Sequence, residues 1–194
     1  MAKGFFGISG GSGGVSSVTG EGVNNSDANN PVITKTPTHA SIFVSNNNED
    51  VTSVTGDPSL FVIAKVSNLS IPDGGYDGGF DASSSGDFSV NHTDDESDYK
   101  MEISGTVTSL NPDFLNTFIV IKVDSDLQGE FTGGVKAYPV GVTFGVSAEI
   151  GFGIKVYGKL QKNESINLSL SSSAESDLIL NDCIFFAEKI QPST

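Results

Sequence analysis

The chain has 194 residues, a formal net charge of −14 and a charged fraction of 18%, so its polar surface depends mostly on Ser, Thr, Asn and Gly. A field of this sign repels phosphate backbones and anionic lipid headgroups, which excludes nucleic acid and membrane from the expected partners. The single cysteine, Cys183, excludes an intrachain disulfide, and we interpret it as a small buried hydrophobe. No apolar run approaches the ~20 residues that a membrane-spanning helix needs.

Residues 1–37 are expected to form an extended N-terminal anchoring arm. Residues 4–14 read GFFGISGGSGG, and the stretch that follows is rich in Ser, Asn and Gly. Such a composition cannot build a hydrophobic core of its own. No continuous apolar segment follows Met1, so we expect no signal peptide and synthesis in a reducing cytoplasm. The prolines in NPVITKTP mark the boundary with a β-sandwich domain over residues 38–194.

Beyond the arm the apolar pattern has a period of two, which predicts strands. A short strand is expected at 41–44. The run LFVIAKV at 60–66 is apolar on both faces except for Lys65, which predicts a central strand. Residues 72–98 are rich in Gly, Ser and Asp, and we expect a long loop there, functional or mobile.

Two clear strands follow this loop. In residues 99–108 apolar and polar side chains alternate, which predicts a half-buried strand. Its inward side chains are Tyr99, Met101, Ile103 and Val107. The run TFIVIKV at 117–123 is β-branched and nearly all apolar, as expected of a strand buried on both sides.

The last third of the chain continues the strand pattern. Every even position from 140 to 156 is apolar, which exceeds one ordinary strand, and Gly151 and Gly153 predict a bend, bulge or hairpin within it. Residues 165–170 alternate as a further strand. A turn is predicted at 171–176, before a closing strand at 178–190 that is apolar on both faces.

No window of helix length keeps a helical period, so the sequence predicts an all-β protein. About eight strands with long loops indicate a jelly-roll-like β-sandwich preceded by the extended Gly/Ser/Asn-rich arm. Strands with two apolar faces need cover on the second face, from another layer or from a neighbouring subunit. Because burial of apolar area there stabilises the assembly by ~25 cal/mol per Å2, we expect a homo-oligomer.

The residues offer no catalytic constellation, so we expect the protein not to be an enzyme. Residues 7–11 match G-x-S-x-G formally, but that motif needs a strand before it and a helix after it. His39 and His92 have no spacing partner, and one cysteine cannot complete a zinc site. We interpret both histidines as solvent-exposed loop residues.

An acidic, glycine-rich loop is the candidate ion site. A repeated D-G-G-aromatic unit places three carboxylates, Asp73, Asp77 and Asp81, on a stretch that could offer calcium several hard oxygen ligands. The spacing is not that of an EF-hand, and a solvated, mutually repelling loop is the simpler interpretation. We therefore expect no cofactor, with calcium as the alternative.

The same loop carries two aromatic residues among glycines, Tyr76 and Phe80. Exposed rings on such a backbone can stack on a sugar or dock a partner protein. They can equally fold back over the sandwich, and both interpretations stay open.

The stretch VSSVTGEGVNNSDANNPVI at 15–33 resembles a segment that recurs in bacteriophage virion proteins, especially fibre and tail proteins. There it links an anchoring end to a distal domain. The resemblance implies that the arm attaches the protein to the particle, in the virion after synthesis in the host cytoplasm. The residues that we expect to carry the attachment are Gly4, Phe5 and Phe6, before this stretch, and Val15, Val18, Val23, Asn30, Pro31 and Ile33 within it.

The C-terminal stretch KLQKNESINLSLSSSAESDLILNDCIFFAEKI resembles the closing strands of trimeric jelly rolls of the complement C1q and tumour-necrosis-factor type, in pattern rather than in motif. This resemblance implies a homotrimer. Together the two resemblances imply a head fibre, a capsid decoration protein or a small tail component, with capsid or tail proteins as partners. The alternative is a carbohydrate-binding or adhesive module at a tail tip, possibly calcium-assisted, that recognises a host surface glycan.

Overall fold

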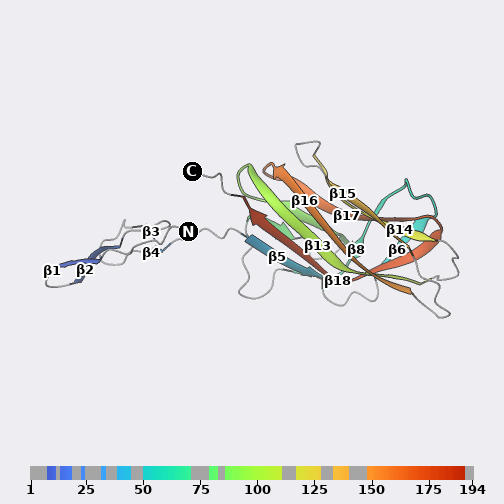
Figure 1. Cartoon of the computed structure of the whole chain (residues 1–194), viewed down its shortest axis with the longest axis horizontal. Coiled ribbons are helices and arrows are strands. Elements are labelled where there is room, and N and C mark those ends of the chain that lie inside the picture. Colours follow the sequence, from blue (N-terminus) through green and yellow to red (C-terminus); the bar gives the residue numbers. More distant parts are fainter. Residues whose placement is uncertain are drawn as a thin grey trace. The chain divides into compact units, whose positions relative to one another are not determined.

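In the part of the chain that it describes, the computed structural model consists of strands joined by turns and loops (Figure 1). No helix in this part could span a bilayer. Contacts between residues divide the chain into two units, 1–37 and 38–194. The structure describes residues 8–11, 14–18, 23–24, 32–33, 39–44, 50–70, 79–82, 86–110, 117–127, 133–139 and 148–190.

The first unit contains two short antiparallel pairs. Strand β1 (Ile8–Gly11) pairs with β2 (Gly14–Val18), and β3 (Val23–Asn24) pairs with β4 (Val32–Ile33). The serine of the G-x-S-x-G match, Ser9, therefore lies in a strand that is followed by another strand. The helix that a nucleophile elbow requires does not follow it.

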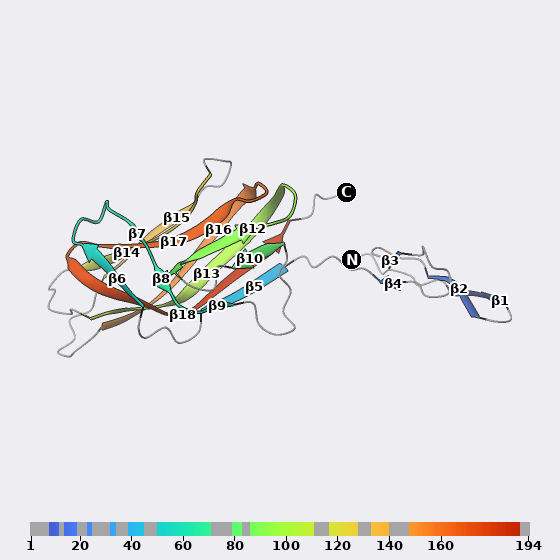
Figure 2. The ribbon, with the colours of Figure 1, turned by 180° about the vertical axis from the view of Figure 1, so that it is seen from behind.

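The second unit is built from two sheets (Figures 1 and 2). The first runs in the order β16-β13-β18-β5-β9, and β6 also pairs with β18. These strands span Ala148–Leu160 (β16), Ser97–Ser109 (β13), Glu175–Lys189 (β18), His39–Val44 (β5), Leu69–Ser70 (β9) and Val51–Thr55 (β6).

The second sheet runs in the order β10-β12-β17-β14-β15, and β7 also pairs with β17. These strands span Phe80–Ala82 (β10), Ser89–His92 (β12), Ser165–Ser172 (β17), Phe118–Ser125 (β14), Gly134–Pro139 (β15) and Val62–Ile63 (β7). A separate pair joins β8 (Lys65–Val66) to β11 (Gly86–Asp87).

The pairing of the main strands is nested along the chain. β5 pairs with the last strand, β18; β12 pairs with β17, β13 with β16, and β14 with β15, all antiparallel. One long antiparallel ribbon wrapped into two sheets has this order, which is that of a jelly roll. The predicted all-β, jelly-roll-like sandwich is therefore confirmed.

The core lies between the two sheets and follows the period of two. On β13 the predicted inward residues are fully buried. On β17 and β14 the inward residues pack against them from the second sheet. The inward residues of these three strands are Tyr99, Met101, Ile103, Val107, Ile166, Leu168, Leu170, Ile119, Ile121 and Val123.

The closing strand β18 changes its inward face halfway along. Gly105 of β13 pairs with Cys183 and Val107 pairs with Leu180, so β18 has one additional residue between these two pairs. Apart from Ile179, which is also buried, its buried positions accordingly change from even to odd numbers: Ser176, Leu178 and Leu180, then Cys183, Phe185 and Ala187. This bulge explains part of the apolar pattern on both faces that the sequence shows at 178–190.

Several predicted elements differ from the structure. Residues 72–98 are not one long loop, because β10, β11 and β12 lie within them and β13 begins at Ser97. The run 60–66 is not a central strand: Ala64 separates β7 from β8, and its backbone N–H donates to Leu168 O while its carbonyl accepts from the Phe88 N–H. The predicted turn at 171–176 is shorter, since β17 extends to Ser172 and β18 begins at Glu175.

The predicted break at Gly151 and Gly153 is wrong. β16 pairs with β13 residue by residue from Leu160 opposite Ser97 to Ala148 opposite Ser109, without a bulge. The glycines lie inside one continuous strand of 13 residues. Residues 140–147, the first part of the same pattern, lie outside the described residues.

The outer side of the second sheet is covered in part by the chain itself. The carbonyl of Pro58 accepts a hydrogen bond from the Ser171 hydroxyl at 3.0 Å, and the ammonium group of Lys122 lies 5.3 Å from the ring centroid of Phe61. Pro58 and Phe61 therefore supply some of the second-face cover that the sequence assigned to another layer or subunit.

The open side of β16 is closed by side chains from β15. The Tyr138 hydroxyl lies 3.2 Å from the Gly153 nitrogen and 3.3 Å from its carbonyl oxygen, and the Lys136 ammonium donates to the same oxygen at 2.6 Å. These contacts satisfy edge groups of β16 that would otherwise be open to another strand.

Alanine substitutions at two glycines should distinguish a glycine that the bulge requires from a glycine in a regularly paired strand. A Cβ on Gly105 would lie 2.6 Å from the Asp182 carbonyl oxygen, so Gly105→Ala must displace β18 and should cost about 1–3 kcal/mol. A Cβ on Gly151 would meet nothing within 4 Å, so Gly151→Ala should cost nothing and gain up to about 1 kcal/mol. Urea unfolding with an unchanged m-value measures both; equal effects would contradict the bulge argument.

Candidate functional site

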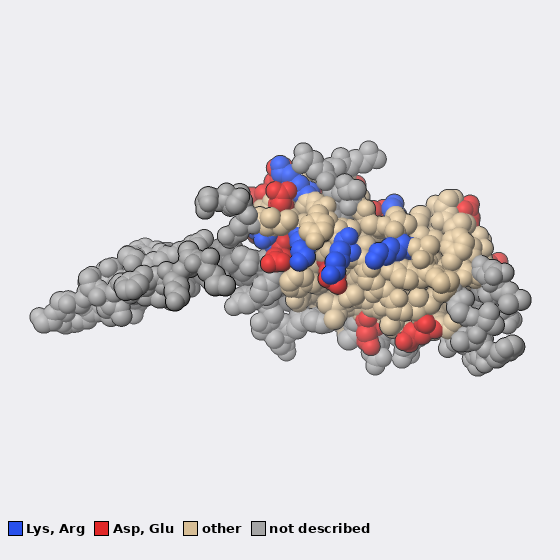
Figure 3. Space-filling model, in the orientation of Figure 1, with Lys and Arg blue, Asp and Glu red and all other residues tan. Residues whose placement is uncertain are grey.

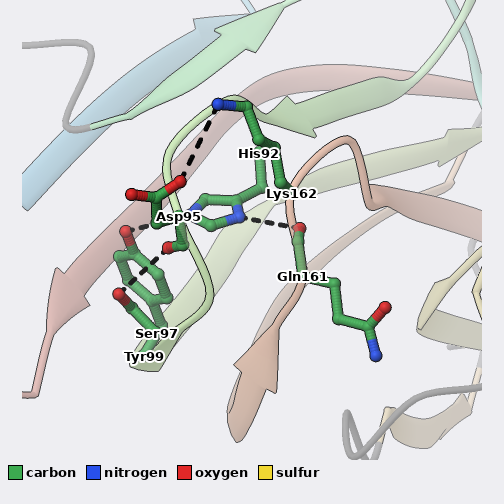
Figure 4. A network of polar contacts seen from close by, with 6 residues as sticks. All are labelled: His92, Asp95, Ser97, Tyr99, Gln161 and Lys162. Atoms are coloured by element: carbon green, nitrogen blue, oxygen red, sulfur yellow. Dashed lines mark hydrogen bonds and ion pairs between the residues drawn. The ribbon is translucent and has the colours of Figure 1, made fainter.

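The most polar part of the interior surrounds His92, at the end of β12 (Figure 4). The ring is 0% exposed. Its Nδ1 lies 2.8 Å from the Gln161 carbonyl oxygen, and its Nε2 lies 3.1 Å from the Tyr99 hydroxyl. Because a carbonyl can only accept, Nδ1 carries a proton and donates to it; in the neutral ring, Nε2 then accepts from Tyr99.

The prediction that His92 is a solvent-exposed loop residue is therefore wrong. Phe88, Val90 and His92 alternate with polar neighbours, and all three are buried. The period-two signal was present in the sequence, but the surrounding Gly, Ser and Asp residues obscured it. His39 begins β5, and its side chain lies outside the described residues.

Aromatic rings surround His92. Phe80 lies 5.3 Å from the His92 ring and 5.1 Å from the Tyr99 ring, the latter at 73° between planes. Phe80 also contacts Phe185 at 5.4 Å, and His92 lies edge-on to Tyr99 at 5.2 Å. Edge-to-face contacts at these separations are favourable, so the rings hold β10, β12, β13 and β18 together.

A turn between β16 and β17 completes the cluster. Glu164 is 0% exposed; its carboxylate accepts from the Gln161 N–H at 2.7 Å and from the Ser125 hydroxyl. Two backbone hydrogen bonds tie this turn to β12. The backbone N–H of His92 donates to the Glu164 carbonyl at 2.8 Å, and the backbone N–H of Asn163 donates to the His92 carbonyl at 2.7 Å. Asn163 has a φ of 65°, a conformation that asparagine adopts more readily than most residues.

Two buried groups of the domain, Tyr99 in this cluster and Cys183 farther along β18, have raised pKa values. Burial, and secondarily the negative charge of Asp94, raises the pKa of Tyr99 to about 12. Burial alone raises the pKa of the Cys183 thiol to about 12, which fits the interpretation of this residue as a buried hydrophobe. Both groups therefore stay protonated at neutral pH.

The enclosed position of these residues decides what the cluster can do. His92, Tyr99 and Glu164 are fully buried, and their hydrogen bonds join β12, β13, β14 and the 161–164 turn. A substrate could not contact their reactive atoms without opening the sandwich. The cluster is suited to stabilising the contacts between strands at this end of the domain.

Charged residues surround the cluster on the surface. Lys162 lies 3.8 Å from Asp95, and Lys159 pairs with Glu96. Among the described residues no group of three or more His, Cys, Asp or Glu side chains could hold a metal ion. Asp81 is exposed, and its carboxylate accepts from the Ala82 N–H at 2.9 Å. Asp73 and Asp77 lie outside the described residues, so the calcium alternative stays a prediction.

The structure describes one of the two aromatic residues that the sequence offered as ligand contacts. Phe80 is 1% exposed and belongs to the core, which is the second of the two interpretations that the sequence left open. Its ring cannot stack on a ligand in this position. Tyr76 lies outside the described residues.

The proposed attachment residues belong to the first unit. Val15 and Val18 lie in β2, Val23 in β3 and Ile33 in β4. The other members, Gly4, Phe5, Phe6, Asn30 and Pro31, lie outside the described residues.

Glu164 and Gln161 were not anticipated from the sequence. Glu164 stands in a polar turn, QKNE, where an exposed carboxylate is the ordinary expectation. Its burial follows from contacts with Ser125 of β14, 39 residues away in the chain, and no local pattern records such a pairing.

Comparison with known proteins gives a likeness in structure alone. No family model matches the chain, and no curated protein matches it. Among solved structures it is similar to Eiger TNF from S. frugiperda, with 10% sequence identity over 81% of this chain and 97% of that chain, at a TM-score of 0.43. A likeness at this level carries no argument about activity or partners, so the proposals below depend on the residues of this chain.

The raised pKa of Tyr99 predicts a loss of stability at high pH. An unfolded tyrosine titrates near 10, so the stability is fully present below pH 10 and is lost as pH rises towards 12. Cys183 adds a loss between about 9 and 12. Tyr99→Phe should reduce the alkaline loss and lower stability at pH 7 by about 1–2 kcal/mol, because the His92 Nε2 loses its partner.

Tyr157, which is 58% exposed, provides the matched control. Tyr157→Phe should change neither the stability at pH 7 nor its alkaline dependence. Chemical unfolding of both variants between pH 7 and 12 measures the difference. If Tyr99→Phe and Tyr157→Phe gave the same alkaline slope, the assignment of that slope to Tyr99 would be wrong.

Proposed function

We propose that this chain is a non-enzymatic structural protein of a bacteriophage virion, a homotrimer attached to the particle through residues 1–37. The β-sandwich is displayed outward, as a head fibre, a capsid decoration protein or a small tail component. Its partners are its own copies and capsid or tail proteins.

The observation that carries the proposal is the difference between the two units. In residues 1–37 two lysines and two acidic residues cancel, so the whole net charge of −14 belongs to residues 38–194. The strongly acidic domain favours exposure to solvent, whereas the neutral first unit can approach another protein without a charge penalty. This division supports attachment through the first unit and display of the second.

The buried polar cluster supports a role without catalysis. Among the described residues, the fully buried titratable side chains hold strands together and present no reactive atom to solvent. The mechanism of attachment is polyvalent: three arms docked side by side raise the effective concentration of each, so weak single contacts give a stable anchor.

The alternative of an adhesive, glycan-binding module has lost one of its two aromatic contacts, since Phe80 lies in the core. No observation on the described residues favours it over the structural role.

Deletion of residues 1–33 tests the attachment. The shortened chain should keep its β domain but lose incorporation into particles by at least about tenfold, because the polyvalent anchor is gone. A control chain carries a shuffled sequence of the same composition in place of residues 1–33. Quantification of the protein in purified particles measures both. Unchanged incorporation of the shortened chain would refute the anchor; full incorporation of the shuffled chain would refute specific contacts by Val15, Val18, Val23 and Ile33.

A further inference from the structure

His92 has a hydrogen-bond partner at each ring nitrogen, and the two partners suit the neutral ring. The Gln161 carbonyl oxygen, 2.8 Å from Nδ1, can only accept, and the Tyr99 hydroxyl, 3.1 Å from Nε2, donates to that nitrogen. A protonated ring donates from both nitrogens, so the hydroxyl would have to turn and accept. The described residues give this hydroxyl no second hydrogen-bond partner. Protonation would therefore cost the closed cluster a hydrogen bond and would also bury a charge.

The titratable groups that face His92 come from β13, from the segment between β12 and β13, and from the 161–164 turn. They are Tyr99, Asp94 and Glu164, whereas the buried side chains of β10, β17 and β18 are uncharged. Asp94 acts on the Tyr99 hydroxyl through its charge. Glu164 is joined to His92 through Gln161, whose N–H donates to the carboxylate and whose carbonyl accepts from the ring.

Neither of these carboxylates bonds to the His92 ring, because both ring nitrogens have uncharged partners. An imidazolium in this position would have no carboxylate in direct contact, and its solvent would be excluded because the ring is 0% exposed. The cost of burying the charge therefore exceeds the indirect attraction of Asp94 and Glu164. The closed cluster binds a proton at His92 less readily than an exposed histidine does.

Exposed charges near the cluster are paired with one another. Lys159 pairs with Glu96, and Lys162 lies 3.8 Å from Asp95. Figure 3 shows lysines beside acidic side chains on one face of the domain. Surface pairs of this kind are solvated and contribute little at a distance, so they do not supply the buried ring with a counter-charge.

The strands that the cluster holds have few other backbone contacts. β10 is the edge of the second sheet and pairs with β12 at three positions, and β12 pairs with β17 at only three. By contrast, β14 pairs with β17 at seven positions. The two backbone bonds between His92 and the 161–164 turn extend the contact of β12, and they depend on the same residue. Loss of the His92 contacts would therefore loosen β10 and β12 before the rest of the sheet.

We infer that His92 makes the attachment of β10 and β12 sensitive to acid: when its ring takes up a proton, these two strands separate from β17 while the other strands stay paired. An exposed histidine titrates near pH 6.5, and the open form binds the proton more readily than the closed form. Opening therefore becomes more favourable as the pH falls through this range. Separation exposes the buried side chains of Phe80 and Val90. The inference goes beyond the proposed function and does not depend on it.

The test is amide hydrogen exchange of the full chain, followed by NMR between pH 7 and 4.5 and corrected for the intrinsic pH dependence of exchange. The backbone N–H groups of His92 and Asn163 report on the attachment, because each is hydrogen-bonded across it, and those of β13 are the reference. Protection of the two reporters should fall by at least about tenfold relative to β13, since each pH unit below the titration of the open ring adds up to a factor of ten.

Three variants identify the group that titrates. His92→Gln should remove the pH dependence of the reporters. His39→Gln is the matched control, because His39 is the other histidine of the chain, and it should behave like the wild type. Glu164→Gln keeps an acceptor for the Gln161 N–H, removes the nearby carboxylate and should also keep the pH dependence. Circular dichroism confirms that each variant is folded.

The ring nitrogen signals of His92 in the wild type keep the test decisive if His92→Gln does not fold. They should show the neutral form with a proton on Nδ1 at pH 7, and the ring should become protonated over the same pH range in which the reporters lose protection. Reporters that stay protected relative to β13 down to pH 4.5 would overturn the inference. So would an acid loss that persists in folded His92→Gln, or one that disappears in Glu164→Gln, because the proton would then act elsewhere.

Discussion

The position of β13 between β16 and β18 is the constraint on which the domain depends. Both neighbours pair with it along nearly its whole length, so the inward side chains of three long strands are aligned by one register. The register on the β18 side changes at Gly105, where β18 accommodates an additional residue. Without that bulge, Cys183, Phe185 and Ala187 would face outward and Asp182, Ile184 and Phe186 would take their places, which would put a carboxylate into the core.

Two different sets of polar contacts stabilise the domain, one at an end of the sandwich and one along the edge of β16. At the end where β12 stops, His92 and Glu164 are buried, and each is hydrogen-bonded to groups from other strands. Buried polar groups are tolerated only when their partners are present, so this cluster specifies the arrangement of β12, β14 and the 161–164 turn. Along the side, Tyr138 and Lys136 close β16 against strand addition while leaving its outer face bare. The backbone groups of Gly153 on the β16 edge are thus occupied, whereas β15, the edge strand of the second sheet, is largely exposed.

Symmetry constrains the proposed assembly of copies. Heterologous contacts between copies form either rings or open filaments, depending on whether the rotation closes. An acidic domain limits contact to the few surfaces where carboxylates are balanced or absent, and the neutral first unit is free to contact a different protein. In the proposed role, charge distinguishes the acidic domain that would be displayed from the neutral unit that would attach.

Local patterns in the sequence determined the fold class. The period of two in residues 99–108 and 165–170 places each side chain on one side of a sheet, and alternation needs no knowledge of the partner strand. The segment at 60–66 shows the limit: its composition indicates a buried strand, but backbone bonds of Ala64 to Leu168 and Phe88 break it into two short pieces.

What the tertiary structure alone decided concerns groups whose environment comes from distant parts of the chain. His92 reads as an exposed residue because its sequence neighbours are polar, and it is buried because Phe80, Tyr99 and Gln161 enclose it. The glycines of β16 read as a break, and they lie in a continuous strand because β13 pairs with every residue around them. The sequence determined which side chains are polar and which are apolar. Which of them are exposed to solvent was decided by the pairing between strands, because strand pairing is a non-local property that no single segment encodes.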